Sequence, residues 1–329
     1  MTLSKLAKLA NVSVSVVSKA FSGRDDISEH MREHVFKVAR ENGCFQQFYH
    51  ARYDKPVIAV IIPEAISKYY IRYIQKLKEE IELNGYTMLL SISNFDTELT
   101  NELVKYYVVH SKVDGLILID GTFTPSFNPS DFNTVIISIS NENKDFSGTH
   151  IRKSVSKGIH NALAFLYENN HRKIGYIGEF LTEQKQLSVI KELENLGLGV
   201  NKKWFFSSSL RFEEAGKKGV EQIFTAKGEK PTAIIGAYGY ITQGILAKLK
   251  EMNISVPDDV SVVSLNNEPS PISNELDVSY VSSNIDNLCS IAIDVLNAKI
   301  GTDNPNSTIS VIDVDYSFYK GNSIKTAKQ

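Results

Sequence analysis

The chain has 329 residues, of which 42% are hydrophobic and 22% charged, and its formal net charge is −2. This composition excludes a disordered chain, a collagen and a coiled-coil rod, and the length is typical of two or more domains. Two distant cysteines, Cys44 and Cys289, exclude a disulfide scaffold and a zinc ribbon. No stretch has the length and apolar character of a signal peptide or a membrane span. We therefore expect a soluble, cytoplasmic protein.

Residues 1–55 carry nine basic and six acidic side chains, whereas the rest of the chain is net acidic. A small basic unit before a large acidic one indicates an anionic partner, although an excess of three charges is weak evidence. The apolar spacing in this unit predicts three short helices, and a side chain suited to N-capping precedes each one. The predicted helices cover residues 3–10, 14–21 and 29–42, with Thr2, Ser13 and Ser28 as their caps.

The first two helices are separated by only three residues, 11–13, with Val12 as an apolar pivot. This is helix-turn-helix spacing, in which the second helix enters the DNA major groove. Residues near its N-terminus would meet base edges, and hydroxyls would meet phosphate oxygens. The candidate base-reading residues are Val14, Ser15, Val16 and Lys19, and the candidate phosphate-facing residues are Thr2, Ser13, Ser18, Ser22 and Ser28. The alternative is that the serines are only caps and the bundle is a docking module.

From Val57 onward, short apolar runs alternate with helical spacing. The runs predict strands at 57–62, 87–93, 116–119, 135–139, 174–177, 204–206, 233–236 and 260–265. A series of βαβ units predicts a mostly parallel, doubly wound sheet, and about 270 residues favour two such halves. Ligands of these folds bind at the carboxyl ends of the strands.

Four segments resemble the LacI/GalR family of bacterial transcriptional regulators. Leu6–Lys19 (LAKLANVSVSVVSK) is similar to the family's headpiece, and the match continues through Ile27-Ser28 and Arg32–Val35. Val113–Leu118 (VDGLIL), Asn170–Gly178 (NHRKIGYIG) and Val256–Val263 (VPDDVSVV) resemble three later family motifs. The segments occur in the family's order over nearly the whole chain, which makes the resemblance specific.

The resemblance implies an N-terminal all-α helix-turn-helix headpiece followed by an α/β periplasmic-binding-protein-like (type I) effector domain of two doubly wound parallel-sheet subdomains. It assigns residues 1–46 to DNA binding, 47–56 to an atypical hinge and 57–329 to effector binding and dimerisation. The chain would cross between subdomains near Ser154, Ser283 and Pro305. The N-subdomain would then comprise about 57–153 and 284–305, and the C-subdomain about 154–283 and 306–322.

The hinge departs from the family pattern, because its usual Pro-Asn pair is absent and Tyr53 stands where the family has a leucine that enters the minor groove. Arg52 and Tyr53 are therefore candidate DNA contacts. The alternative, which we favour, is that Phe48, Tyr49 and Tyr53 pack the headpiece on the core.

The effector pocket departs as well. The positions of three family carboxylates align with Ser154, Gly239 and the pair Asn266-Asn267, and Lys185 aligns with the family's sugar-binding arginine. We expect the remaining pocket to be aromatic and neutral. The candidate effector-binding residues are Tyr69, Tyr70, Ser154, Lys185, Tyr238 and Asn266, with Tyr240 and Trp204 as further aromatics.

The resulting hypothesis is a sequence-specific repressor that binds a pseudo-palindromic operator as a homodimer. Its effector would be a sugar, a sugar phosphate or a nucleoside-like molecule, with an anionic group near Lys185 as one option. The alternative is a pocket that has lost sugar binding, so that a corepressor protein or no effector controls the regulator. We expect no cofactor, no metal and no membrane partner.

Two other classes are disfavoured. A solute-binding protein would need export, and neither a signal peptide nor the helix-turn-helix fits that role. An enzyme is disfavoured because the chain contains no phosphate loop, nucleophile elbow or paired metal-ligand motif. His171 lies between a predicted helix and a predicted strand, a position that favours helix capping over catalysis.

Overall fold

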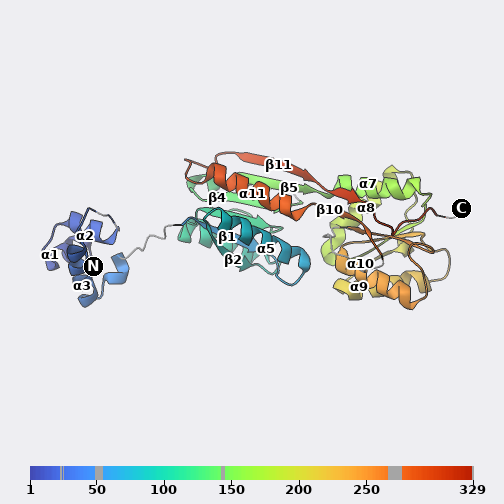
Figure 1. Ribbon diagram of the computed structural model, residues 1–329, viewed down its shortest axis with the longest axis horizontal. Helices are drawn as coiled ribbons and strands as arrows, with labels where there is room; N and C mark the ends of the chain where they lie inside the picture. The colour runs from blue at the N-terminus through green and yellow to red at the C-terminus, as the bar shows by residue number, and fades with distance from the viewer. Residues whose placement is uncertain (23, 25, 49–54, 142–144, 266–275, 328–329) are drawn as a thin grey trace. The chain divides into compact units, whose positions relative to one another are not determined.

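The computed structural model describes residues 1–22, 24, 26–48, 55–141, 145–265 and 276–327. The chain divides into two compact units, residues 1–56 and 57–329, which are drawn in Figure 1. None of the helices in the described ranges combines the length and apolar character that crossing a bilayer requires.

The first unit is a bundle of helices: α1 (Leu3–Leu9), α2 (Val14–Phe21), α3 (Glu29–Glu41) and the short α4 (Phe45–Phe48). The predicted caps Thr2, Ser13 and Ser28 are confirmed, because each hydroxyl accepts the backbone N–H three residues on. Asn11 adopts a left-handed φ of 54° in the turn between α1 and α2, a conformation that asparagine tolerates better than most residues.

The second unit contains two six-stranded sheets. The N-sheet has the order β11-β5-β4-β3-β1-β2, and all its recorded pairings are parallel. Its strands are β1 (Val57–Ile62), β2 (Thr87–Ile92), β3 (Gly115–Ile119), β4 (Val135–Ser140), β5 (Gly148–Ser154) and β11 (Ile309–Asp315). Five of the six residues of β1 are fully buried, as a continuous apolar run predicts.

Helices cover both faces of the N-sheet. The helices α5 (Lys68–Leu83) and α11 (Ile285–Lys299) share one hydrophobic cluster with the sheet, and α6 (Thr97–Lys105) with the π-helical turn 106–111 contributes to the other. A 3-10 turn covers residues 129–131.

The C-sheet has the order β12-β10-β9-β8-β6-β7, with β12 antiparallel to β10 at one edge. Its strands are β6 (Ile174–Glu179), β7 (Phe205–Ser208), β8 (Ala233–Gly236), β9 (Ser261–Leu265), β10 (Ser279–Ser282) and β12 (Ser317–Tyr319). Its helices are α7 (Val155–Glu168), α8 (Glu183–Asn195), α9 (Phe212–Thr225) and α10 (Gly239–Glu251), with 3-10 turns at 180–182 and 202–204.

The chain passes between the sheets after β5, between β10 and α11, and after β11. The predicted third crossing near Pro305 is wrong. Residues 309–315 form β11, which pairs with β5 over seven residues and so belongs to the N-subdomain. The crossing follows Asp315, and Tyr316 is buried there among residues of the C-subdomain core.

Two glycines allow α9 and α10 to approach closely. A Cβ at Gly216 would lie 2.2 Å from the carbonyl oxygen of Ile241, and one at Gly244 would lie 2.0 Å from that of Glu213. Because backbone atoms occupy these places, neither position accommodates a side chain without moving a helix. The glycines therefore fix the relative position of two helices that begin at the carboxyl edge of the C-sheet.

Candidate functional site

The N-terminal face of α2 carries the predicted base-reading residues. Val14 and Ser15 are exposed, as predicted, but Val16 is half-buried because it packs against the core of the bundle. Lys19 forms an ion pair with Asp26, with Nζ 2.7 Å from Oδ2. The base-reading surface is therefore smaller than the sequence suggested, and its lysine is already held by an acidic partner.

The predicted phosphate-facing hydroxyls surround this helix. Thr2, Ser13 and Ser28 accept backbone N–H groups, which leaves each hydroxyl proton able to donate to a phosphate. Ser22 instead donates weakly to the carbonyl oxygen of Lys19, and Ser18 is exposed. Arg52 and Tyr53 lie outside the described residues.

Aromatic side chains of α2, α3 and α4 pack against one another in the headpiece. Phe21 lies 5.0, 5.9 and 5.7 Å, between ring centroids, from Phe36, Phe45 and Phe48. The guanidinium of Arg40 lies 4.6 Å from the centre of the Phe45 ring. The helix α4 thus packs against the headpiece core through its two half-buried phenylalanines. Phe48 packs on the headpiece, while the predicted roles of Tyr49 and Tyr53 fall outside the described residues.

A cavity of about 950 Å³ lies between the carboxyl ends of strands from the two sheets. Among the predicted effector residues, Tyr69, Tyr70, Ser154, Lys185 and Tyr238 all line it, and so does Tyr240. Asn266 lies outside the described residues. Trp204 is not among the lining residues: it is buried in the C-subdomain core, and its indole N–H donates to the carbonyl oxygen of Glu229.

The expectation of an aromatic and neutral pocket is wrong, because charged residues that the sequence analysis did not select also line the cavity. They include Glu64, Asp120, Glu179, Lys153 and Arg211. Each lies at or just beyond the carboxyl end of a strand, apart from Lys153, which is the penultimate residue of β5. The rule that ligands bind at these strand ends would have identified most of them.

A buried ion pair forms the N-subdomain side of the cavity. The side chain of Lys153 has no solvent exposure, and its Nζ lies 2.6 Å from Asp120 Oδ1 and 2.8 Å from the Tyr69 hydroxyl. Tyr69 in turn donates to Asp120 Oδ2. Burial, and after it the negative charge of Asp120, raise the pKa of Tyr69 well above its usual value. Tyr69 is therefore a neutral hydrogen-bonding group at neutral pH.

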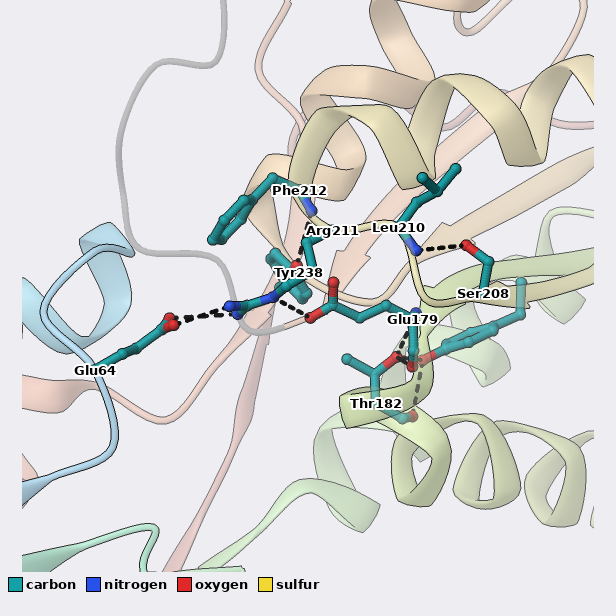
Figure 2. A network of polar contacts seen from close by, with 9 residues as sticks. Glu64, Glu179, Thr182, Ser208, Leu210, Arg211, Phe212 and Tyr238 are labelled. Carbon is teal, nitrogen blue, oxygen red and sulfur yellow. Dashed lines mark hydrogen bonds and ion pairs between the residues drawn. The ribbon is translucent and has the colours of Figure 1, made fainter. Parts of the chain in front are cut away.

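Arg211 joins the two subdomains across the cavity, as Figure 2 shows. Its Nη1 lies 3.1 Å from Glu64 Oε2, in the N-subdomain, and its Nε lies 3.5 Å from Glu179 Oε1, in the C-subdomain. Both carboxylates are buried, with side-chain exposures of 7% and 3%. Glu179 Oε2 has no hydrogen-bond partner. One guanidinium therefore serves two buried carboxylates.

Lys185 lies at the start of α8, and its Nζ donates to the carbonyl oxygen of Ala237 over 3.2 Å. Burial, and after it the positive charge of Lys153, lower the pKa of Lys185 to about 8. A substantial fraction of this amine is therefore neutral in mildly alkaline solution.

Aromatic side chains line the C-subdomain side of the cavity. Phe212 has a left-handed φ of 57°, which is unusual for a bulky residue, and its N–H donates to the Tyr238 hydroxyl. Its ring lies 5.3 Å from that of Tyr240 and below the guanidinium of Arg211. Strained backbone of this kind is concentrated at functional sites.

His171 does not contribute to the cavity and does not cap a helix with its side chain. Its ring contacts the Thr232 hydroxyl and the carbonyl oxygen of Lys325, both at 2.9 Å. It is the backbone N–H of His171 that closes the end of α7, by donating to Leu166. Within the described residues, no cluster of three or more His, Cys, Asp or Glu side chains has the arrangement of a metal site.

Comparisons with known proteins agree with this architecture. A family model for the periplasmic binding protein-like domain matches residues 163–323. The HTH-type transcriptional repressor CytR of Escherichia coli K12 is 26% identical over 282 residues, which cover 81% of this chain and 80% of that protein. The ribose operon repressor of Haemophilus influenzae is 22% identical and covers 80% of each chain.

Solved structures show the same fold over the whole length. A LacI-family transcriptional regulator from Silicibacter pomeroyi superposes with a TM-score of 0.73 at 15% identity, covering 99% of each chain. The lac repressor dimer bound to operator and the anti-inducer ONPF superposes with a TM-score of 0.68 at 16% identity, also covering 99% of each. With the four sequence segments described above, these likenesses show that the chain is similar in sequence to LacI-family transcriptional repressors, shares their fold, and carries a periplasmic binding protein-like domain at residues 163–323.

Proposed function

We propose that this protein is a cytoplasmic transcriptional repressor that binds a pseudo-palindromic operator as a homodimer. The observation that carries the proposal is the helix-turn-helix with an exposed N-terminal face on α2, in the same chain as an α/β unit of the kind that binds small molecules. Residues 1–46 would bind DNA, 47–56 would form the hinge, and 57–329 would bind the effector and the second subunit. No enzymatic activity is part of this proposal.

In this mechanism the effector shifts a population of conformations. A ligand that contacts both sides of the cavity favours the closed arrangement of the two subdomains, and this changes how a dimer presents its headpieces. The ligand can alter repression only by the difference between its affinities for the two arrangements. Charged side chains line both sides of the cavity, and a ligand that contacts both sides at once would bind the closed arrangement more tightly than the open one.

Selection of bound sequences from a random duplex library tests the DNA-binding role. We expect the full-length protein to enrich a palindromic motif, and the double substitution Ser15→Ala, Lys19→Ala to abolish it, because these side chains lie on the exposed face of α2. Lys37→Ala, which removes an exposed lysine from α3, is the matched control. Absence of a motif with the unmodified protein at low salt, where phosphate contacts are strongest, would contradict the proposal.

A second candidate keeps the repressor but replaces the effector by a partner protein. Exposed apolar side chains beside the cavity favour it: Phe180, Leu181 and Leu187 are 66%, 57% and 51% exposed. If this candidate is correct, Phe180→Ser and Leu187→Ser change repression in cells while operator affinity of the purified protein stays the same. If the cavity ligand controls the protein, these substitutions have no effect in either assay.

A further inference from the structure

We propose that the cavity binds a small ligand with two chemically distinct ends: an anionic group held by Lys185, and a hydroxyl or amine that donates to Glu179. The inference rests on the proposed function, in which this cavity is the effector site, and it names the chemistry of the effector. It differs from a neutral sugar read by hydroxyl contacts alone.

The first observation is the unbalanced charge of Lys185. Lys153, Arg152 and Arg211 are the other cations within the cavity lining that are at least half-buried, and each has a carboxylate partner. Among the described residues of this kind, Lys185 is the one without a carboxylate in ion-pair contact: its Nζ contacts the carbonyl oxygen of Ala237 and lies 5.9 Å from the centre of the Tyr238 ring. Lys185 is half-buried, and a cation that is partly removed from water without an ion-pair partner is unfavourable, so an anion bound against it relieves part of that cost.

The second observation is the orphan oxygen of Glu179. The carboxylate is 3% exposed, and one of its oxygens faces Arg211. The other, Oε2, has no partner, and Figure 2 shows it directed away from the guanidinium. Buried carboxylate oxygens are normally hydrogen-bonded. A ligand hydroxyl or amine would supply the missing donor.

The charges around Lys185 show why one end alone does not suffice. Lys153, on β5, and Asp120, after β3, cancel each other through their 2.6 Å contact. Glu179, at the end of β6, shares Arg211 with Glu64, so that group has one negative charge in excess. The Tyr238 hydroxyl accepts the Phe212 N–H, and Lys185 Nζ lies 5.9 Å from the centre of the Tyr238 ring. A neutral ligand would leave the positive charge of Lys185 without an ion-pair partner. An anion that carries no hydrogen-bond donor would leave Glu179 Oε2 without a hydrogen bond.

The aromatic residues indicate a ring scaffold between the two ends. Tyr238, Tyr240 and Phe212 line one side of the cavity, and Tyr69 and Tyr70 line the other. Aromatic faces pack against the apolar face of a sugar ring or against a planar ring. Phosphorylated sugars and sugar acids both combine such a ring or chain with hydroxyls and an anionic group, and the test separates these two sources.

Isothermal titration of the full-length protein with matched probes tests the inference. The probes are glucose, glucose 6-phosphate, glucosamine 6-phosphate and gluconate, with inorganic phosphate as the isolated anion. We expect at least one acidic sugar to bind about ten- to a hundredfold more tightly than glucose, because a charge-assisted hydrogen bond is worth that much. Preference for glucose 6-phosphate over gluconate identifies a phosphate, and the reverse identifies a carboxylate.

Substitutions assign the two ends. Lys185→Met should lower the affinity of the acidic sugar by about ten- to a hundredfold and leave that of glucose unchanged, whereas Lys185→Arg should retain much of it. Lys68→Met is the matched control, since Lys68 is an exposed lysine in the same lining. The affinity for the acid should also fall as the pH rises through about 8, where Lys185 loses its proton.

Three results would overturn the inference: equal binding of glucose and the acidic sugars, equal effects of Lys185→Met and Lys68→Met, or no binding of any acidic probe at millimolar concentration. Circular dichroism of each variant separates a lost contact from a lost fold. Sequence selection with the same protein sample distinguishes failure of this inference from failure of the proposed function, because operator binding would persist in the first case and not in the second.

Discussion

Arg211 and Glu64 join two β-sheets that share no strand, with Nη1 and Oε2 3.1 Å apart. The contact spans the cavity, so the protein itself supplies one connection between its two sides. Glu179 holds the same guanidinium from the other side. One guanidinium and two carboxylates thus tie the N-subdomain to the C-subdomain.

Substitution of Arg211 should destabilise the unit formed by residues 57–329. Arg211→Gln leaves two buried carboxylates without their cation, and we expect it to lower the free energy of unfolding by about 1–3 kcal/mol, less than for a fully buried pair because Arg211 is partly exposed. Glu64→Gln should lower the free energy of unfolding by less, since Arg211 keeps its ion pair with Glu179.

Urea unfolding of both single variants and the double variant measures the coupling energy between Arg211 and Glu64. Lys157→Met, which breaks an exposed pair with Asp315, is the control and should cost little. Additive effects of the two substitutions would show that the pair is energetically unimportant.

Asp26 should restrain DNA binding. Its hydrogen bond with Lys19 lowers the pKa of the Asp26 carboxyl, so the pair is charged at neutral pH. Asp26→Asn should raise operator affinity about two- to fivefold, a small gain because the pair with Lys19 is exposed and weak, and because the lysine no longer has to leave this partner. Fluorescence anisotropy with a labelled operator measures this. Glu41→Gln removes an exposed acid elsewhere in the headpiece, and an equal gain there would mean that only overall charge matters.

Phe48 should stabilise α2, the second helix of the helix-turn-helix, by packing against its last residue. Phe48→Ala removes a ring that lies 5.7 Å from that of Phe21, the last residue of α2, and we expect about 1–3 kcal/mol less protection of this helix. Hydrogen exchange of peptides from residues 14–21, measured in the full-length protein, reports the change. Gln46→Ala, at an exposed neighbouring position, should leave exchange unaltered. Unchanged exchange in both variants would show that α4 is dispensable for the headpiece.

Stability should fall in mild acid because of His171. Burial is the main cause that lowers the pKa of this histidine, so the unfolded chain binds its proton more readily than the folded chain. The contribution of neutral His171 to the free energy of unfolding is complete above the usual histidine pKa of about 6.5. It is lost progressively as the pH falls below that value. Urea unfolding at pH 7.5 and 5.5 should show a larger loss for the unmodified protein than for His171→Gln. The exposed His110 supplies the control, His110→Gln, which should keep the full pH dependence.

Much of the fold could be predicted from the sequence where burial is uniform. The run at residues 57–62 and the capped helices of the headpiece match the structure closely, because one apolar pattern or one hydroxyl determines each. The strands β5, β10, β11 and β12 were not predicted, because their residues are polar or of mixed character. In β5, His150 is buried only because Ser138 and the carbonyl oxygen of Phe146 satisfy its ring. Ser138 comes from β4 and Phe146 from the connection before β5, so the pattern within β5 does not indicate burial.

The residues that line the cavity were predicted only in part, because some of them matter through tertiary contacts that the local sequence does not show. Tyr69, Lys185 and Tyr238 were selected by alignment with family positions, and all line the cavity. Glu64, Glu179 and Arg211 were missed because their significance lies in one contact that joins three distant parts of the chain. Each alone is an ordinary charged residue that follows or ends a strand, and their combination depends on tertiary structure.

The last crossing has a consequence for synthesis of the protein. Residues 309–319 supply one edge strand to each sheet, β11 to the first and β12 to the second, so both subdomains stay incomplete until these residues leave the ribosome. The helices of the headpiece are contiguous and are made first. A premature stop codon before residue 309 would therefore spare the helices α1 to α4 and remove one strand from each of the two sheets.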